Sequence, residues 1–170
     1  MVSDIVEFED YSAKVKEAMR KEAISFLKEV GGELRSLTER KSRKKSSKTA
    51  GSYKYVVDES QLAVHIGSDY ENAVWEEFGT GIHASETGHV GRKGWWVYVT
   101  GSASKTPSKD SKSYSSPEEA KKVVAILKSK GLDAHMTQGK KANRPLLKAF
   151  TSSKSKIIKR ANEIYKGLNS

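Results

Sequence analysis

Apolar residues recur at intervals of three and four between Tyr11 and Leu37, which is the spacing of a long amphipathic helix. This pattern constrains the fold most, because a long helix with one apolar stripe must pack that stripe against other elements. Gly31 and Gly32 each lower helix propensity by about 1 kcal/mol relative to alanine. A break or kink is therefore expected there, and the helix can end at Val30.

Two runs of alternating character, 53–58 and 61–67, predict a β-hairpin or two neighbouring strands. In the second run the apolar residues share one face, which places His65 on the other, exposed face. A short helix is predicted next, over residues 70–78, with Asp69 as its N-terminal cap. Its apolar stripe contains Tyr70, Ala73, Val74 and Phe78.

The residues from Trp95 to Thr100 have the β-branched and aromatic content of a strand. A helix follows after a Ser/Lys-rich linker, with Ser116 and Glu119 forming a capping box and Gly131 as its stop. The run 132–137 alternates like a second strand. These three elements are interpreted as a βαβ unit with a right-handed crossover, added to the fold as a strand–helix–strand insertion.

A last helix is predicted to begin around Pro145, with an apolar stripe and a strongly basic opposite face. The chain is therefore expected to form one α+β domain over residues 1–170. A small, mainly antiparallel sheet is packed by the long N-terminal helix and the C-terminal helix. Residues 40–51 and 102–115, which are rich in Ser and Lys, are predicted to be mobile loops.

The chain carries 31 Lys and Arg against 21 Asp and Glu, a net charge of +10 that suits a nucleic acid or an acidic protein surface as partner. Either a solvated loop or an electrostatic contact with DNA or a partner ring explains the densest basic run. That run contains Arg40, Lys41, Arg43, Lys44, Lys45 and Lys48.

The chain contains no cysteine, which excludes disulfides and thiol catalysis. The acidic start lacks signal-peptide features, and no apolar run approaches the ~20 residues of a membrane helix, so a cytoplasmic protein with no membrane contact is expected.

The motif search favours a protein without catalysis, cofactor or metal. The four histidines lack the spacing of a metal site, and no serine lies in a hydrolase motif. The phosphate-binding GxxxxGK[ST] motif is also absent. The alternative function is a basic nucleic-acid-binding protein, in which aromatic side chains stack on bases while the basic run contacts phosphates. Its aromatic candidates are Trp75, Trp95, Trp96 and Tyr98.

Three segments taken in order, YENAVWEEFGTG, GRKGWWVYVTG and GKKANRPLLKAF, resemble the tail-component family of tailed phages and prophages. Members of that family are head–tail joining proteins, described as neck or tail-completion proteins. The resemblance implies a structural virion protein, made in the host cytoplasm, with no enzymatic turnover. It also implies a closed homo-oligomeric ring, expected to contain six subunits, that contacts connector and tail-tube proteins and the passing phage DNA.

The EFGTG turn and the Arg-Pro pair are the candidate interface in this resemblance. The residues are Glu76, Glu77, Phe78, Gly79, Thr80, Gly81, Arg144 and Pro145. Two glycines that tolerate positive φ can present the acidic residues on a tight turn, which then docks against a neighbouring subunit or packs on its own domain. In the docking case, the basic face of the last helix is a plausible complement.

Overall fold

The computed structural model describes residues 10–43, 47–88, 91–100 and 112–167. Its elements are α1 (Ser12–Lys41), α2 (Ser47–Ala50), β1 (Lys54–Asp58), β2 (Ala63–Gly67), α3 (Glu71–Phe78), a 3₁₀ helix (Gly81–Thr87), β3 (Trp96–Val99), α4 (Pro117–Ser129), β4 (Ala134–Thr137) and α5 (Pro145–Gly167). The predicted α+β class is confirmed, and the long N-terminal helix packs on the C-terminal helix as expected. Within the described ranges, neither of these long helices nor any shorter one is apolar enough to cross a membrane.

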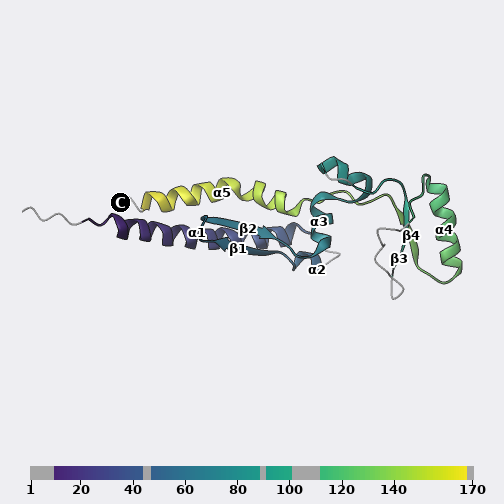
Figure 1. Ribbon diagram of the computed structural model, residues 1–170, viewed down its shortest axis with the longest axis horizontal. Helices are drawn as coiled ribbons and strands as arrows, with labels where there is room; N and C mark the ends of the chain where they lie inside the picture. Colours follow the sequence, from purple (N-terminus) through teal and green to yellow (C-terminus); the bar gives the residue numbers. More distant parts are fainter. Residues whose placement is uncertain (1–9, 44–46, 89–90, 101–111, 168–170) are drawn as a thin grey trace, which may run out of the picture.

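The centre of the molecule lies where α1, α5 and the first hairpin meet. Figure 1 shows α1 and α5 side by side in opposite directions, with β1 and β2 lying along α1. Val30 and Leu34 of α1 and Ala149 of α5 form the buried cluster, and Val64 and Ile66 of β2 pack against it. The alternation of the second strand is thus confirmed, and His65 is exposed as predicted.

The predicted break in the first helix is wrong, because α1 continues through both glycines to Lys41. The reason is a tertiary contact with the hairpin. A Cβ atom at Gly31 would lie 2.4 Å from Cδ2 of the Tyr55 ring, whereas nothing lies within 4 Å of the corresponding position at Gly32. Gly31 therefore lets the hairpin approach the helix closely, and packing outweighs the low helix propensity.

The expectation of one sheet is also wrong, because the described strands form two separate two-stranded sheets. β1 pairs with β2, and β3 pairs with β4, both antiparallel. The right-handed βαβ crossover is wrong for the same reason, since it requires parallel strands. α4 packs on the β3–β4 pair, where Ala120 and Ala134 are both fully buried. The insertion is therefore an antiparallel pair covered by one helix, at the end of the molecule away from the α1–α5 pair (Figure 1).

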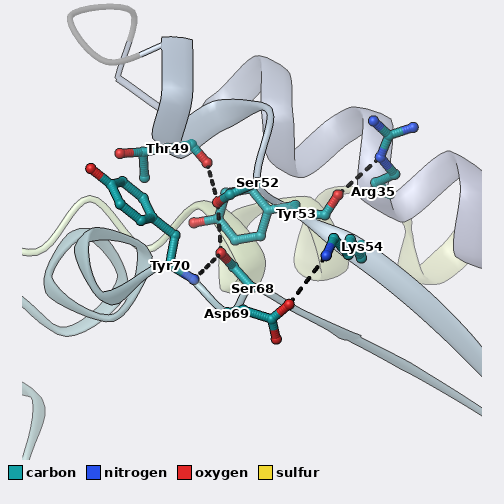
Figure 2. Close-up of polar contacts among 8 residues, drawn as sticks. All are labelled: Arg35, Thr49, Ser52, Tyr53, Lys54, Ser68, Asp69 and Tyr70. Atoms are coloured by element: carbon teal, nitrogen blue, oxygen red, sulfur yellow. Dashed lines mark hydrogen bonds and ion pairs between the residues drawn. The ribbon is translucent and has the colours of Figure 1, made fainter.

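The sequence predicted N-terminal capping residues for α3 and α4, and the structure confirms the one at α4. The Ser116 hydroxyl accepts a hydrogen bond from the Glu119 N–H at 3.3 Å, so the predicted start of α4 is confirmed. Asp69 does not cap α3, because its carboxylate pairs instead with Lys54 at 3.2 Å. Figure 2 shows this pair next to Ser68, whose hydroxyl accepts the Tyr70 N–H at 3.0 Å.

Tyr53 is the largest fully buried side chain of the described residues and lies between the end of α1 and the start of β1. Its carbonyl oxygen accepts a hydrogen bond from Nε of Arg35 at 3.0 Å (Figure 2). Burial raises the pKa of Tyr53 to about 12, and the negative charges of Glu76 and Glu77 add to this rise. The nearby Ser42 side chain opposes this rise. The buried phenol oxygen has no hydrogen-bond partner among the described residues. In the folded state the phenol therefore stays protonated at pH values above the ordinary pKa of tyrosine.

Replacing the two adjacent glycines of α1 separately tests the packing explanation. We expect Gly32→Ala to raise the free energy of unfolding by about 0.5 to 1 kcal/mol, since alanine favours the helix and meets no neighbour. Gly31→Ala is expected to lower it by about 1 to 3 kcal/mol, because the methyl group collides with the Tyr55 ring. Urea denaturation of both variants measures this difference. Equal stabilisation by both would show that the hairpin does not constrain Gly31.

The raised pKa of Tyr53 predicts a pH-dependent loss of stability. Its folded-state value of about 12 exceeds the ordinary value of 10.0, so its contribution is complete below pH 10 and is lost as the pH rises through 12. Between pH 9 and pH 11, wild type is expected to lose about 1 kcal/mol more than Tyr53→Phe, which keeps the ring. Urea midpoints at the two pH values give this difference. Parallel losses in both proteins would contradict it.

Candidate functional site

The EFGTG segment ends α3 in a turn that requires glycine at two positions. Gly79 has φ 78°, and its N–H donates to the Trp75 carbonyl oxygen at 2.9 Å. Gly81 has φ 61°, and a Cβ atom there would lie 1.8 Å from the carbonyl oxygen of Gln138. The prediction of positive φ at both glycines is confirmed. Larger residues are excluded both by backbone conformation and by the close approach of another segment.

That other segment is the chain leading into α5, which pairs with the turn through its backbone. The Thr80 N–H donates to the Lys140 carbonyl oxygen at 2.9 Å, and the Ile82 N–H donates to that of Gln138 at 3.0 Å. In return, the Thr80 hydroxyl accepts the Lys140 N–H at 2.9 Å. Two of the three segments that carry the family resemblance therefore lie against each other, although about 60 residues separate them.

Glu76 joins three parts of the chain at this junction. Its side chain is 2% exposed, and Oε1 accepts hydrogen bonds from the Arg43 N–H at 2.5 Å and from Nδ2 of Asn143 at 2.9 Å. Nδ2 of Asn143 also donates to the Lys41 carbonyl oxygen at 2.8 Å. The carboxylate thus holds the end of α1 and the approach to α5 against α3. Such a buried carboxylate is tolerated because Oε1 accepts hydrogen bonds from two parts of the chain.

Glu77 caps the first turn of α5. Oε2 accepts the Leu146 N–H at 2.9 Å, and Oε1 accepts the Leu147 N–H at 3.2 Å. These are among the donors that a helix leaves without internal partners at its N-terminus, where negative charge is also favoured by the helix dipole. No local Ser, Thr, Asp or Asn precedes Pro145 in the capping position, where Arg144 stands. That missing cap was the sequence signal for a distant capping residue.

The prediction that Glu76 and Glu77 are presented on an accessible turn is therefore wrong. Both side chains are buried and point into the junction, because each satisfies backbone donors of its own chain. Arg144 and Pro145 belong to the same junction. Arg144 has φ 54°, stabilised by its N–H bond to the Glu76 carbonyl oxygen at 3.2 Å, and Pro145 is fully buried. Of the two interpretations of the EFGTG turn, packing on its own domain describes these residues.

An open apolar groove lies on the outer side of the same turn. It has a volume of about 450 Å³ and is lined by α3, the EFGTG turn, the 3₁₀ helix and the start of β3. Val74 is 48% exposed and Trp75 is 37% exposed, whereas Ala73 is buried on the opposite side of α3. Phe78 is half-buried and lines the groove, as do Thr80 and Gly81. The predicted stripe of α3 is corrected accordingly, because Val74 faces outward and Ala73 inward.

The basic run does not behave as one loop. Arg40 and Lys41 belong to α1, and residues 47–50 form α2, so the interpretation of 40–51 as a loop is wrong for these residues. Arg43 donates from its side chain to the Lys141 carbonyl oxygen at 2.7 Å, and Lys48 lies 5.3 Å from the centre of the Tyr70 ring. Lys44 and Lys45 lie outside the described residues.

The predicted loop 102–115 is also only partly described, and residues 102–111 lie outside the described ranges. At its end, Tyr114 forms an antiparallel bridge with Trp95. Its N–H donates to the Trp95 carbonyl oxygen at 2.7 Å, and the reverse bond measures 2.8 Å. This part of the segment is therefore paired with the strand edge instead of forming a free loop.

The basic face of α5 is partly neutralised inside the molecule. Lys156 pairs with Glu33 of α1 at 2.7 Å, and Arg160 lies 3.6 Å from Glu29. These pairs connect the two long helices along their exposed side. The predicted complementarity between an acidic turn and this basic face across subunits is wrong on the acidic side, because Glu76 and Glu77 are buried and bonded to their own chain.

In the described part of the chain, no three His, Asp or Glu side chains gather in a way that could hold a metal ion. His83 instead hydrogen-bonds Glu86 at 2.9 Å, and His135 pairs with Asp133 at 2.9 Å. The bond from His83 lowers the pKa of Glu86. Comparison of the chain with protein-family models, curated proteins and solved structures finds no match.

Truncating Glu77 tests the capping geometry. We expect Glu77→Ala to lower the free energy of unfolding by about 1 to 3 kcal/mol, because two partly buried N–H groups of α5 lose their acceptor. Glu77→Gln should lose less, since the amide oxygen still accepts one bond. Glu17→Ala on the exposed side of α1 is the control, with a change within about 0.5 kcal/mol. If Glu77→Ala matched that control in thermal denaturation, the cap would not stabilise the fold.

Proposed function

We propose that this chain is a structural, non-catalytic protein of a tailed phage or prophage, in the neck or tail-completion ring that joins head to tail. The observation that carries the proposal is the junction itself. Of the three segments that carry the resemblance, the one ending in EFGTG and the one with the Arg-Pro pair at the start of α5 form a single hydrogen-bonded unit through Glu76, Glu77 and Asn143. A chance likeness of two distant segments has no reason to place both in one buried junction.

The distribution of apolar side chains also supports an assembly protein. In the described part of the chain, five of the eight buried hydrophobic residues are alanines, so few large side chains are fully covered there. Many large ones are exposed along the long helices and α3. They include Tyr11, Val15, Met19, Val74, Trp75, Leu147, Phe150, Ile158 and Tyr165. Exposed apolar surface of this extent is typical of contacts that are covered on association.

A groove beside the central cluster adds a second apolar surface. It holds about 520 Å³ between α1, α5 and β2 and is lined by residues such as Phe26, Leu27 and Phe150. A closed ring requires two different surfaces on each subunit, and the elongated molecule has apolar surface both here and beside α3 (Figure 1). Because Glu76 and Glu77 are buried within their own chain, contacts between subunits should depend on apolar burial more than on this acidic pair.

The proposal includes a place and partners for the protein. It would be made in the host cytoplasm and then incorporated in the virion as a homo-oligomeric ring, expected to contain six subunits. Its neighbours would be connector and tail-tube proteins, and phage DNA would pass through the ring. Assembly would be controlled by those neighbours, so the free chain would be a monomer or a weak oligomer.

Co-sedimentation with phage particles tests this function. The purified chain should move into the particle fraction when mixed with isolated tail tubes or connectors, and the shift should persist at moderate salt because apolar contacts dominate. Phe150→Asp should reduce the shift, because Phe150 is 50% exposed beside the central groove. Lys159→Asp, exposed on the same helix, is the matched control.

Two results would contradict the proposal. One is failure of wild type to associate with either structure. The other is tight binding to duplex DNA by a chain that stays monomeric, with affinity falling steeply as salt rises. The second result would establish the nucleic-acid-binding alternative, whose aromatic and basic candidates are partly used within the fold. The centre of the Trp96 ring, for example, lies 5.3 Å from the Arg92 guanidinium, and the Arg43 side chain donates to the Lys141 carbonyl oxygen.

A further inference from the structure

The groove beside α3, named here the Trp96 groove, is lined chiefly by Val74, Trp75, Phe78, Arg92 and Trp96. Three of these side chains are aromatic, and Val74 and Trp75 are substantially exposed. Among the described residues that line it, Arg92 is the charged one and none is a carboxylate. The groove therefore fits an apolar segment that carries negative charge.

The surroundings of the Trp96 groove add to this preference. Lys93 follows Arg92 and is exposed, and the exposed Lys140 is hydrogen-bonded through its backbone to Thr80 in the groove wall. The nearby carboxylate of Glu86 is hydrogen-bonded to His83. Positive charge thus exceeds negative charge around the groove, which favours an acidic occupant.

One segment of the chain has this chemistry. Residues 1–9, MVSDIVEFE, contain three carboxylates and no basic residue, although the whole chain carries a net charge of +10. The carboxylates alternate with large apolar residues, among them Ile5, Val6 and Phe8. This segment precedes α1 and lies outside the described residues.

The segment cannot reach the Trp96 groove of its own chain. α1 has 30 residues and is therefore about 45 Å long, and the Arg43 N–H just beyond its C-terminal end bonds Glu76 of α3. Figure 1 shows the start of α1 and α3 at opposite ends of this helix. Phe8 is within about 7 Å of Asp10 and Ile5 within about 17 Å, even for a fully extended chain.

We propose that the acidic apolar segment 1–9 of one copy docks in the Trp96 groove of a second copy. The proposal rests on the assembly function above and names two of the surfaces that subunits would use. The segment and the groove are different surfaces at opposite ends of α1. When two subunits are joined by one such contact, one subunit still has a free groove and the other still has a free segment. Such head-to-tail contacts continue from subunit to subunit and form a ring when the rotation closes.

The absence of cysteine allows a direct test by disulfide trapping in the full chain. Val6→Cys is combined with Val74→Cys, so that each chain carries one thiol in the segment and one in the groove. Mild oxidation at moderate protein concentration should give a ladder of linked dimers, trimers and larger species on a non-reducing gel. The control combines Val6→Cys with Ile126→Cys, whose site on α4 is 56% exposed. The ladder should form at least tenfold faster than in this control.

A charge variant gives a second measurement. Adding Glu7→Lys and Glu9→Lys to the double-cysteine chain should slow the formation of disulfide-linked species several-fold. Adding Arg92→Glu as well should restore part of that rate. A rate no faster than in the α4 control would overturn the proposal. A linked monomer that migrates anomalously would also overturn it, because the segment would then occupy its own groove. Co-sedimentation with phage particles is scored separately, so a ladder without particle binding contradicts the joining function alone.

Discussion

The buried carboxylates of Glu76 and Glu77 are the interaction on which the arrangement of this molecule depends. One carboxylate accepts hydrogen bonds from the end of α1 and from Asn143, while the other caps α5. A charged group with so little exposure is costly unless its bonds are made, and here both sets of bonds reach across the chain. The direction in which α5 leaves the junction, and hence its alignment with α1, follows from that requirement.

The rest of the fold is thinly packed around this junction. The fully covered hydrophobic side chains are mainly alanines, and the two grooves are lined by larger apolar residues that remain accessible. A monomer built in this way has a small core for its length, so its stability depends on a few polar contacts and on Tyr53. The same feature leaves apolar surface for neighbours, which connects the stability of the fold with the proposed assembly function.

Sequence reasoning succeeded where the physical signal is local. The start of α4 at Ser116, its stop at Gly131 and the start of α5 at Pro145 follow from capping and backbone preferences within a few residues. It failed where a distant contact outweighs a local preference. Gly31 continues α1 because the Tyr55 ring packs there, and Asp69 pairs with Lys54 instead of capping α3.

The sequence by itself determined the α+β class, the two long helices, the hairpin and the glycine turn after Phe78, because periodicity and positive φ are properties of short stretches. It could not determine the sheet arrangement or the exposure of the candidate site. The local sequence of two adjacent glutamates in a short helix is the same whether their side chains face solvent or accept hydrogen bonds from backbone N–H groups. Only the return of the chain at Asn143 to Leu147 brings those donors to Glu76 and Glu77, and this depends on contacts across about 70 residues. Tertiary structure therefore decided which groups are buried, and left the apolar groove on the outer side of the turn.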